Sequence, residues 1–122
     1  MPSATGERLA GYATDQLGDA LRTVFVLFED DWKPIYIRDD IRQTYTEDRY
    51  ERVAESFRID FEAGVHERPE TEIGSKAAIV HYHDNAYVFQ FPHEQCHSVL
   101  LSVEPEVGSK LSSFIDGCRD RL

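Results

Sequence analysis

The segment AAIVHYHDNAYVFQFP, residues 77–92, decides the fold that we expect for this chain. It holds two runs rich in β-branched and aromatic residues, Ala77–His83 and Ala86–Phe91, and only Asp84-Asn85 separates them. Two polar residues between two such runs indicate a β-hairpin with a two-residue turn. The segment therefore predicts a pair of antiparallel strands.

A further strand is predicted over Ser98–Val103, so that the hairpin becomes a three-stranded meander. The two-residue turn places His81 opposite Val88. One face of the meander then carries Ile79, His81, Val88, Val99 and Leu101, and the other carries Val80, Tyr82, Tyr87, Phe89, Phe91 and Leu100. Because neither face is polar, we expect helices on both sides of the sheet.

The other elements follow from apolar periodicity and from capping residues such as Gly18 and Thr46. The predicted elements are a helix over 5–17, strands over 21–28 and 34–38, a helix over 47–62, strands over 77–83, 86–91 and 98–103, and a helix from 105 onward. Residues 65–75 are predicted to be the longest loop. The fold class is α+β in the order α-β-β-α-β-β-β-α, a five-stranded antiparallel sheet between helix layers, with residues 1–122 as a single domain.

The charge balance is strongly acidic. The chain has 23 acidic and 13 basic residues, a formal charge of −10, and its lysines are Lys33, Lys76 and Lys110. Such a surface is typical of proteins in molar salt, where the Debye length falls to ~3 Å and self-repulsion is screened. The arginines form no cluster of the kind that phosphate binding needs, so we expect no nucleic-acid partner.

We expect a cytoplasmic protein without a membrane partner. No apolar run approaches the ~20 residues that span a bilayer, and the first residues lack the pattern of a secretion signal. Cys96 and Cys118 stand 22 positions apart and belong to no Cys-x-x-Cys pair. In a reducing cytoplasm they are expected to be unlinked thiols, one at the start of a strand and one on a helix.

The histidines are the candidates for metal binding. His81 and His83 point to the same face of a strand and could chelate zinc, nickel or copper. His93, Cys96 and His97 gather at the opposite end of the hairpin, so we do not expect the two groups to converge. The alternative is that His81 is a half-buried sheet residue and His83 a neighbour of the turn.

No motif for catalysis or for a cofactor is found. The chain lacks a Gly-x-Ser-x-Gly elbow, and Cys96 with His97 is only a sequence neighbourhood. Residues 73–76 and 107–110 both read x-Gly-Ser-Lys but lack the glycines of a phosphate-binding loop. The acidic pairs are expected to be solvated carboxylates. Trp32 could anchor a partner from an exposed turn or could fold back into the core.

The element order resembles the Roadblock/LC7 fold, a profilin-like sandwich. That resemblance implies a sheet order of 2-1-5-4-3, the middle helix on one face and the terminal helices together on the other. Roadblock-like domains are non-catalytic dimers that scaffold complexes and regulate small GTPases. The stretches LRTV at 21–24, IYIRDD at 35–40 and YVFQFP at 87–92 are also similar to a family of small haloarchaeal proteins with no assigned activity.

We therefore expect a non-enzymatic interaction or regulatory module of a halophilic archaeal cytoplasm, acting as a homodimeric scaffold for a protein partner. The resemblance implies that Ala77–His83 is an edge strand, and an unpaired edge invites pairing with a second copy. The alternative is a sensor domain that binds a metal or a small ligand through His81 and His83.

Overall fold

The structure, a computed structural model of the chain, describes residues 2–44, 46–65 and 77–122. Its elements are α1 (Pro2–Leu17), the 3-10 turn η1 (Gly18–Ala20), β1 (Leu21–Leu27), β2 (Trp32–Ile37), α2 (Asp39–Thr44), α3 (Glu47–Val65), β3 (Ile79–His83), β4 (Ala86–His93), β5 (Cys96–Val103), the 3-10 turn η2 (Pro105–Gly108) and α4 (Ser109–Arg119). The predicted loop lies outside the described residues from position 66 onward, as does the x-Gly-Ser-Lys stretch at 73–76.

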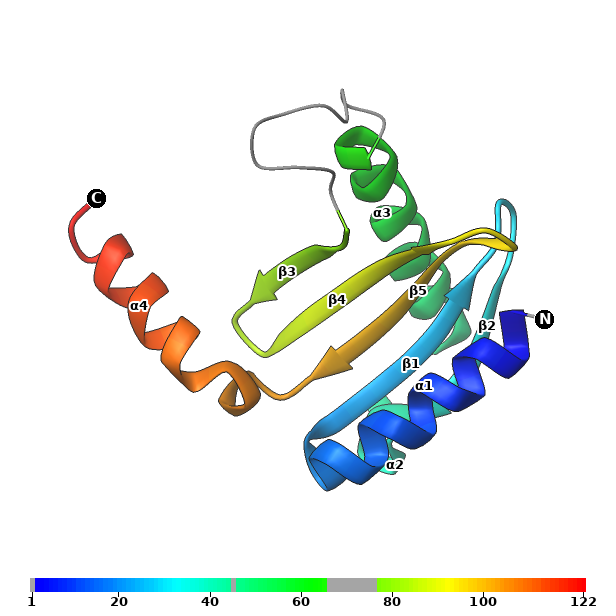
Figure 1. Cartoon of the computed structure of the whole chain (residues 1–122), viewed down its shortest axis with the longest axis horizontal. Helices are drawn as coiled ribbons and strands as arrows, with labels where there is room; N and C mark the ends of the chain where they lie inside the picture. The colour runs from blue at the N-terminus through cyan, green and yellow to red at the C-terminus, as the bar shows by residue number, and fades with distance from the viewer. Residues whose placement is uncertain (1, 45, 66–76) are drawn as a thin grey trace.

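The five strands form one antiparallel sheet in the order β2-β1-β5-β4-β3 (Figure 1). This is the strand order that the resemblance implied, and the α+β class is confirmed. Strand β1 is covered on both faces, because Val24, on the side of α1, and Leu27, on the side of α3, are both fully buried. The β3–β4 register places His81 opposite Val88, as the two-residue turn predicted.

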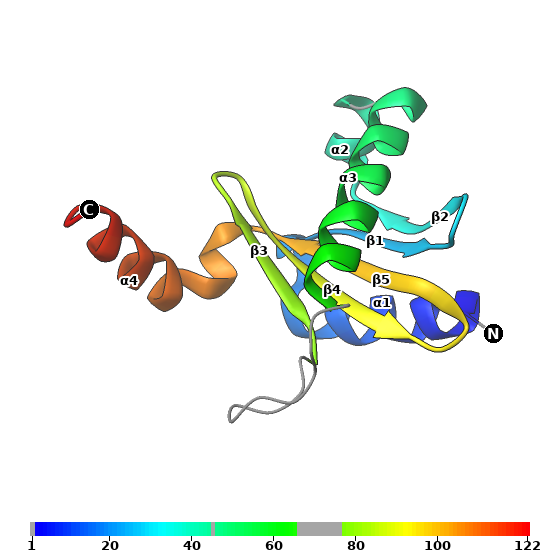
Figure 2. The same ribbon diagram turned by 90° about the horizontal axis from the view of Figure 1, so that it is seen from above.

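Helices cover the two faces of the sheet at different places (Figure 2). On one face α1 packs over β1 and β2, and Ala13 joins a core with Val24 and Leu101. On the opposite face α3 lies above the sheet, and Ala54 joins a second core with Phe25. Gly18 ends α1 with a φ of +56°, a left-handed conformation that glycine adopts without strain.

The predicted facing of β5 was wrong. Leu101 pairs with Phe89 and therefore shares the face of α1, together with Val99, whereas Leu100 pairs with Gln90 and shares the face of α3. The cause is the turn between β4 and β5. The fourth strand does not stop before Pro92 but continues to His93, and an irregularity between these two residues resets the alternation of side chains.

The predicted order of elements was incomplete, because a short helix, α2, follows β2 directly. Asp39 and Asp40 lie in its first turn, where the helix dipole favours acidic side chains. Ile41 points inward and is 5% exposed. The described part of the chain between β2 and β3 therefore holds two consecutive helices, α2 and α3.

The position of α4 departs from the implied pairing of the terminal helices. Figures 1 and 2 both show α4 projecting away from the sheet on the side of β3, while α1 lies alone against its face. No side chain of α4 is buried. The direction is set at Gly108, where an added Cβ would lie 2.8 Å from Cε2 of the buried Tyr87. Among the described residues, no helix is both long and apolar enough to cross a membrane.

A charged cluster ties the end of β5 to the strands beside it. Glu104 accepts hydrogen bonds from Arg22 at 3.0 Å and from Arg38 at 2.9 Å. Arg38 also donates to Asp40 at 2.6 Å, which lowers the pKa of that carboxyl. Burial raises the pKa of Glu104, but the two arginine hydrogen bonds outweigh it, so its pKa lies below the ordinary range.

We predict that Glu104→Gln removes a pH-dependent part of the stability. The pKa of Glu104 is lower in the folded state than in the unfolded state. Its contribution to the free energy of unfolding is therefore fully present above the unfolded-state pKa of about 4.3, and it is lost as the pH falls through the folded-state pKa. Urea unfolding at pH 7 should show a loss of about 1 kcal/mol, and the difference from wild type should narrow below about pH 4. Glu106→Gln, an exposed neighbour, is the control. A difference that stays constant with pH would contradict the role of this cluster.

Candidate interaction surface at the third strand

The two outer strands of the sheet differ in how their edges are protected. The outer strand β2 carries the exposed residues Lys33 and Pro34, and its pairing with β1 is irregular between Val24 and Phe25. Lysine, proline and bulges are the features that prevent an edge from pairing with another chain. The sequence of β3, Ile79–His83, contains none of these residues, and its pairing with β4 is regular. As far as residues 2–44, 46–65 and 77–122 show, the unprotected edge of the sheet is therefore β3.

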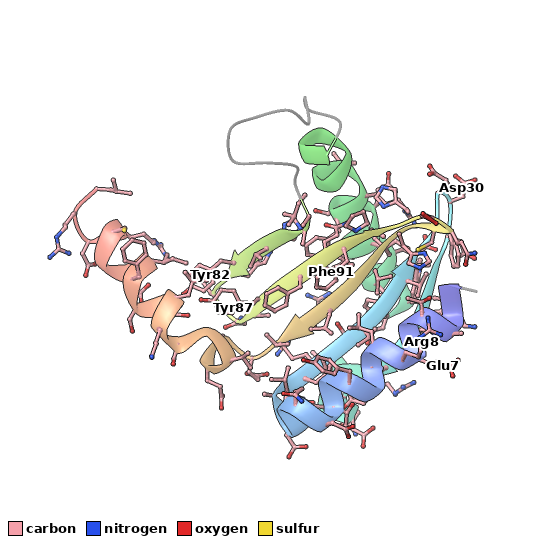
Figure 3. The ribbon with its side chains drawn as sticks, in the orientation of Figure 1. Glu7, Arg8, Asp30, Tyr82, Tyr87 and Phe91 are labelled. Atoms are coloured by element: carbon pink, nitrogen blue, oxygen red, sulfur yellow. The ribbon has the colours of Figure 1, made fainter. Side chains whose placement is uncertain are left out.

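Beside this edge lies an apolar surface, here called the aromatic face, made by Val80, Tyr82, Phe89 and Phe91 of β3 and β4, next to the fully buried Tyr87. Val80 is 50% exposed and Phe91 is 37% exposed. The rings of Tyr82 and Tyr87 lie 4.8 Å apart between centroids. Figure 3 shows Tyr82, Tyr87 and Phe91 spread along the two strands. The aromatic face is on the same side of the sheet as α1, but α1 packs over β1 and β2.

The last helix presents a second exposed apolar surface, here called the α4 stripe, made by Val107, Leu111, Phe114, Ile115 and Cys118. These positions follow the spacing of one helical face. Leu111 is 48% exposed and Phe114 is 69% exposed. The helix is attached to the sheet near its start, where the hydroxyl of Tyr87 donates to the carbonyl of Gly108 at 3.2 Å and lies 2.6 Å from the hydroxyl of Ser112.

On the α3 side of the sheet, His81 belongs to a buried polar network centred on Gln90. The amide nitrogen of Gln90 donates to the carbonyl of Phe57 at 3.1 Å and to the hydroxyl of Ser98 at 3.0 Å. The amide oxygen therefore faces His81, whose Nε2 lies 2.8 Å away and must be the donor. A metal ion could use this nitrogen only by displacing Gln90.

The structure places His81 and His83 on one face, as predicted, and sets both against Phe57. The ring centroids of Phe57 and His81 are 4.7 Å apart, and those of Phe57 and His83 are 6.2 Å apart. Within residues 2–44, 46–65 and 77–122, no group of three or more His, Cys, Asp or Glu side chains is placed to hold a metal ion. His81 packs in the sheet, and His83 is exposed beside the turn.

His93 and His97 lie at the opposite end of the hairpin, as predicted. Nδ1 of His93 accepts a hydrogen bond from the backbone of Gln95 at 3.1 Å, and Nδ1 of His97 lies 2.9 Å from the hydroxyl of Ser98. Cys96 and Cys118 are free thiols. Burial raises the pKa of Cys96, so its thiol is protonated at neutral pH and is a poor nucleophile.

A cavity of about 430 Å³ lies between α3 and the sheet, close to the β3–β4 turn. Its apolar lining includes Phe25, Ile41, Tyr50, Val53, Phe57, Val88 and Leu100, and its polar lining includes Arg22, Arg49, His83, Asp84 and Asn85. Arg58 holds the helix in place by donating to the carbonyls of Phe28 at 2.7 Å and Asp31 at 2.6 Å. No pattern in the sequence indicated this cavity, because its walls come from six separate elements, β1, α2, α3, β3, β4 and β5.

Trp32 folds back against the core. Its ring centroid lies 5.6 Å from those of Phe25 and Tyr50, and its indole nitrogen donates to Glu51 at 3.4 Å. The side chain is half-buried. Of the two alternatives left by the sequence, the structure therefore favours a core residue over an exposed anchor.

We predict that Gln90→Met destabilises the fold by about 1–3 kcal/mol, because it leaves His81 and Ser98 without their buried partner. Gln90 is fully buried, and methionine has a similar volume, so little of the loss should come from a cavity. Chemical denaturation checks the value. Gln95→Met, in the exposed β4–β5 turn, should stay within about 0.5 kcal/mol of wild type. Equal stability of the two variants would show that the network contributes nothing.

Comparison with known proteins gives one match. No curated protein and no solved structure matches this chain. A family model does match, and it covers residues 7–122, from the middle of α1 to the C-terminal residue. The chain belongs to the family described as a domain of unknown function, DUF7522.

Proposed function

We propose that this chain is a non-enzymatic interaction module that works as a homodimeric scaffold, in which the β3 edges of two copies pair. The observation that carries the proposal is the contrast between the two edges. Lys33 and Pro34 protect β2, whereas β3 offers a regular strand without proline, lysine or bulge. Pairing of two β3 strands about a two-fold axis would join both sheets into one.

The side chains of β3 are suited to such a seam. If the two-fold axis passes beside His81, the central residue of β3, antiparallel pairing sets Val80 opposite Tyr82 of the partner subunit. A β-branched residue opposite an aromatic one is a favourable cross-strand pair, worth about 0.2–1 kcal/mol. The aromatic faces of the two copies would then lie next to each other on the same side of the joined sheet.

The acidity of the chain connects this assembly with salt, and we propose that the module works in the cytoplasm of a halophilic archaeon. Two chains with a formal charge of −10 each repel one another when they meet. The Debye length falls from about 10 Å at 0.1 M salt to about 3 Å at 1 M, which removes most of that repulsion. The strand order is the one that the Roadblock/LC7 resemblance implies, and it supports a scaffold that binds a further protein.

We predict that light scattering in 2 M KCl gives twice the chain mass of 14.0 kDa, and that Val80→Lys gives a monomer. Lysine on an edge strand opposes pairing, because its charge would be brought against the second copy. Ile59→Lys is the matched control, since Ile59 is 58% exposed and belongs to α3, not to the strand that would form the seam. A monomeric wild type, or a Val80→Lys variant that remains dimeric, would rule out the β3 pairing.

The cavity under α3 favours a second candidate, a sensor for a small ligand. Its volume of about 430 Å³ falls in the range of small-molecule sites, about 300–1,000 Å³. An apolar floor with Arg22, Arg49 and His83 on its polar side suits a ligand with an aromatic body and an acidic group. Of the two histidines proposed from the sequence, His83 lines the cavity, whereas His81 donates a hydrogen bond to Gln90.

We predict that the anionic aromatic dye anilinonaphthalene sulfonate binds in this cavity, with an increase in its fluorescence. Val53→Trp should abolish most of the increase, because Val53 lines the cavity and the larger ring fills it. Ile59→Trp, six residues further along α3, should leave dye binding unchanged. Equal fluorescence of both variants would place the dye elsewhere, for example on the aromatic face.

A further inference from the structure

Two apolar surfaces of this chain have no covering layer among the described residues. The aromatic face has Val80 and Phe91 open to solvent, and the α4 stripe has Leu111 and Phe114 open. One surface is a flat sheet and the other is the ridge of a helix. These are the two shapes that pack together in α+β proteins.

We propose that the two subunits exchange their last helices, so that the α4 stripe of each copy packs on the aromatic face of the other. This inference rests on the proposed homodimer and adds to it a partner for each of the two surfaces. The exchange is isologous, because the helix and the sheet of one copy meet the sheet and the helix of the second.

The start of α4 sends the helix away from its own sheet. Gly108 is packed against Tyr87 so closely that a Cβ would lie 2.8 Å from the ring, and Ser112 is held 2.6 Å from the Tyr87 hydroxyl. From this attachment α4 projects past the β3 edge, which is the side where a second copy would lie (Figures 1 and 2).

The strand register places the aromatic face of the second copy at the end of the seam from which α4 departs. In an antiparallel pairing of the two β3 strands, the His83 end of one copy lies beside the Ile79 end of the other. Ile79 pairs with Gln90, so the neighbouring Phe91 belongs to that same end of the partner. The exposed Phe91 of the partner subunit therefore lies at the end of the seam from which α4 departs.

Charge and area both fit a second copy of this acidic chain. Residues 109–122 hold three basic and two acidic residues, whereas the whole chain has 13 and 23. Stable interfaces bury about 1,200–2,000 Å², which the five residues of β3 are too few to supply. Two helix–sheet contacts add the missing area, since each buried aromatic ring, such as Phe114 or Phe91, covers about 150–250 Å².

The test is cross-linking between two differently labelled chains in 2 M KCl. One chain carries Cys96→Ser and keeps Cys118, an exposed member of the α4 stripe. The other carries Cys96→Ser, Cys118→Ser and Phe91→Cys. We expect a covalent heterodimer on oxidation of the mixture at micromolar concentration, because docked thiols meet at an effective concentration in the millimolar range.

Two further variants serve as controls for this experiment. Ile59→Cys in place of Phe91→Cys measures random collision, and it should give at least several-fold less heterodimer. Val80→Cys repeats the test at the most exposed position of the aromatic face, in case Phe91→Cys does not fold. A yield that does not exceed the Ile59→Cys control at either position would overturn the exchange of helices.

Light scattering on the Cys96→Ser chain separates failure of this inference from failure of the dimer. A dimer mass without cross-linking would leave the β3 seam intact and overturn the exchange. A monomer mass would overturn both. A last variant carries Cys96→Ser and Phe91→Cys and keeps Cys118, so that both thiols are in one chain. If its disulfide forms within the chain in preference to between chains, α4 covers its own sheet. That result would also overturn the exchange.

Discussion

The structure depends on one constraint: its sheet is apolar on both faces, and both faces must be kept from water. Burial of apolar surface contributes about 25 cal/mol per Å², so a sheet of this composition is stable only between two layers. On one side α3 covers Phe25 and Val88. On the other side α1 covers Val24 and its neighbours, and within the described residues Val80 and Phe91 of the aromatic face stay exposed. The proposed exchange of α4 follows from that incomplete layer.

Polar contacts hold the layers in register where apolar packing alone is not specific. Gln90 lies between Phe89 and Phe91, and its amide links β3, β5 and the backbone of α3. At the other end of the sheet, Glu104 gathers two arginines from β1 and the end of β2. Buried polar groups that are fully paired favour one arrangement over slipped alternatives. His81 is one of these paired groups, because its Nε2 donates to the amide oxygen of Gln90.

In the proposed dimer, charge and assembly would be linked through salt. The formal charge of −10 opposes association, while the unprotected edge of β3 and the α4 stripe favour it. The balance between charge repulsion and apolar burial depends on the salt concentration. Charge repulsion weakens as the ionic strength rises, whereas the free energy gained from apolar burial does not. A scaffold of this kind would assemble in molar salt and loosen in dilute buffer. Under this proposal, the acidic composition and the apolar seam would belong to one adaptation to salt.

The sequence by itself determined the elements that depend on neighbours in the chain. Asp84-Asn85 set the β3–β4 register, and Thr46 marked the start of α3, whose Arg49 donates its backbone N–H to the threonine hydroxyl. A lone glutamine inside an apolar strand could also have signalled the buried network. Only the tertiary structure decided the facing of β5, because an irregularity at Pro92 resets the alternation. It also decided the cavity and the direction of α4, since periodicity shows that a helix has an apolar face but not which surface will cover it.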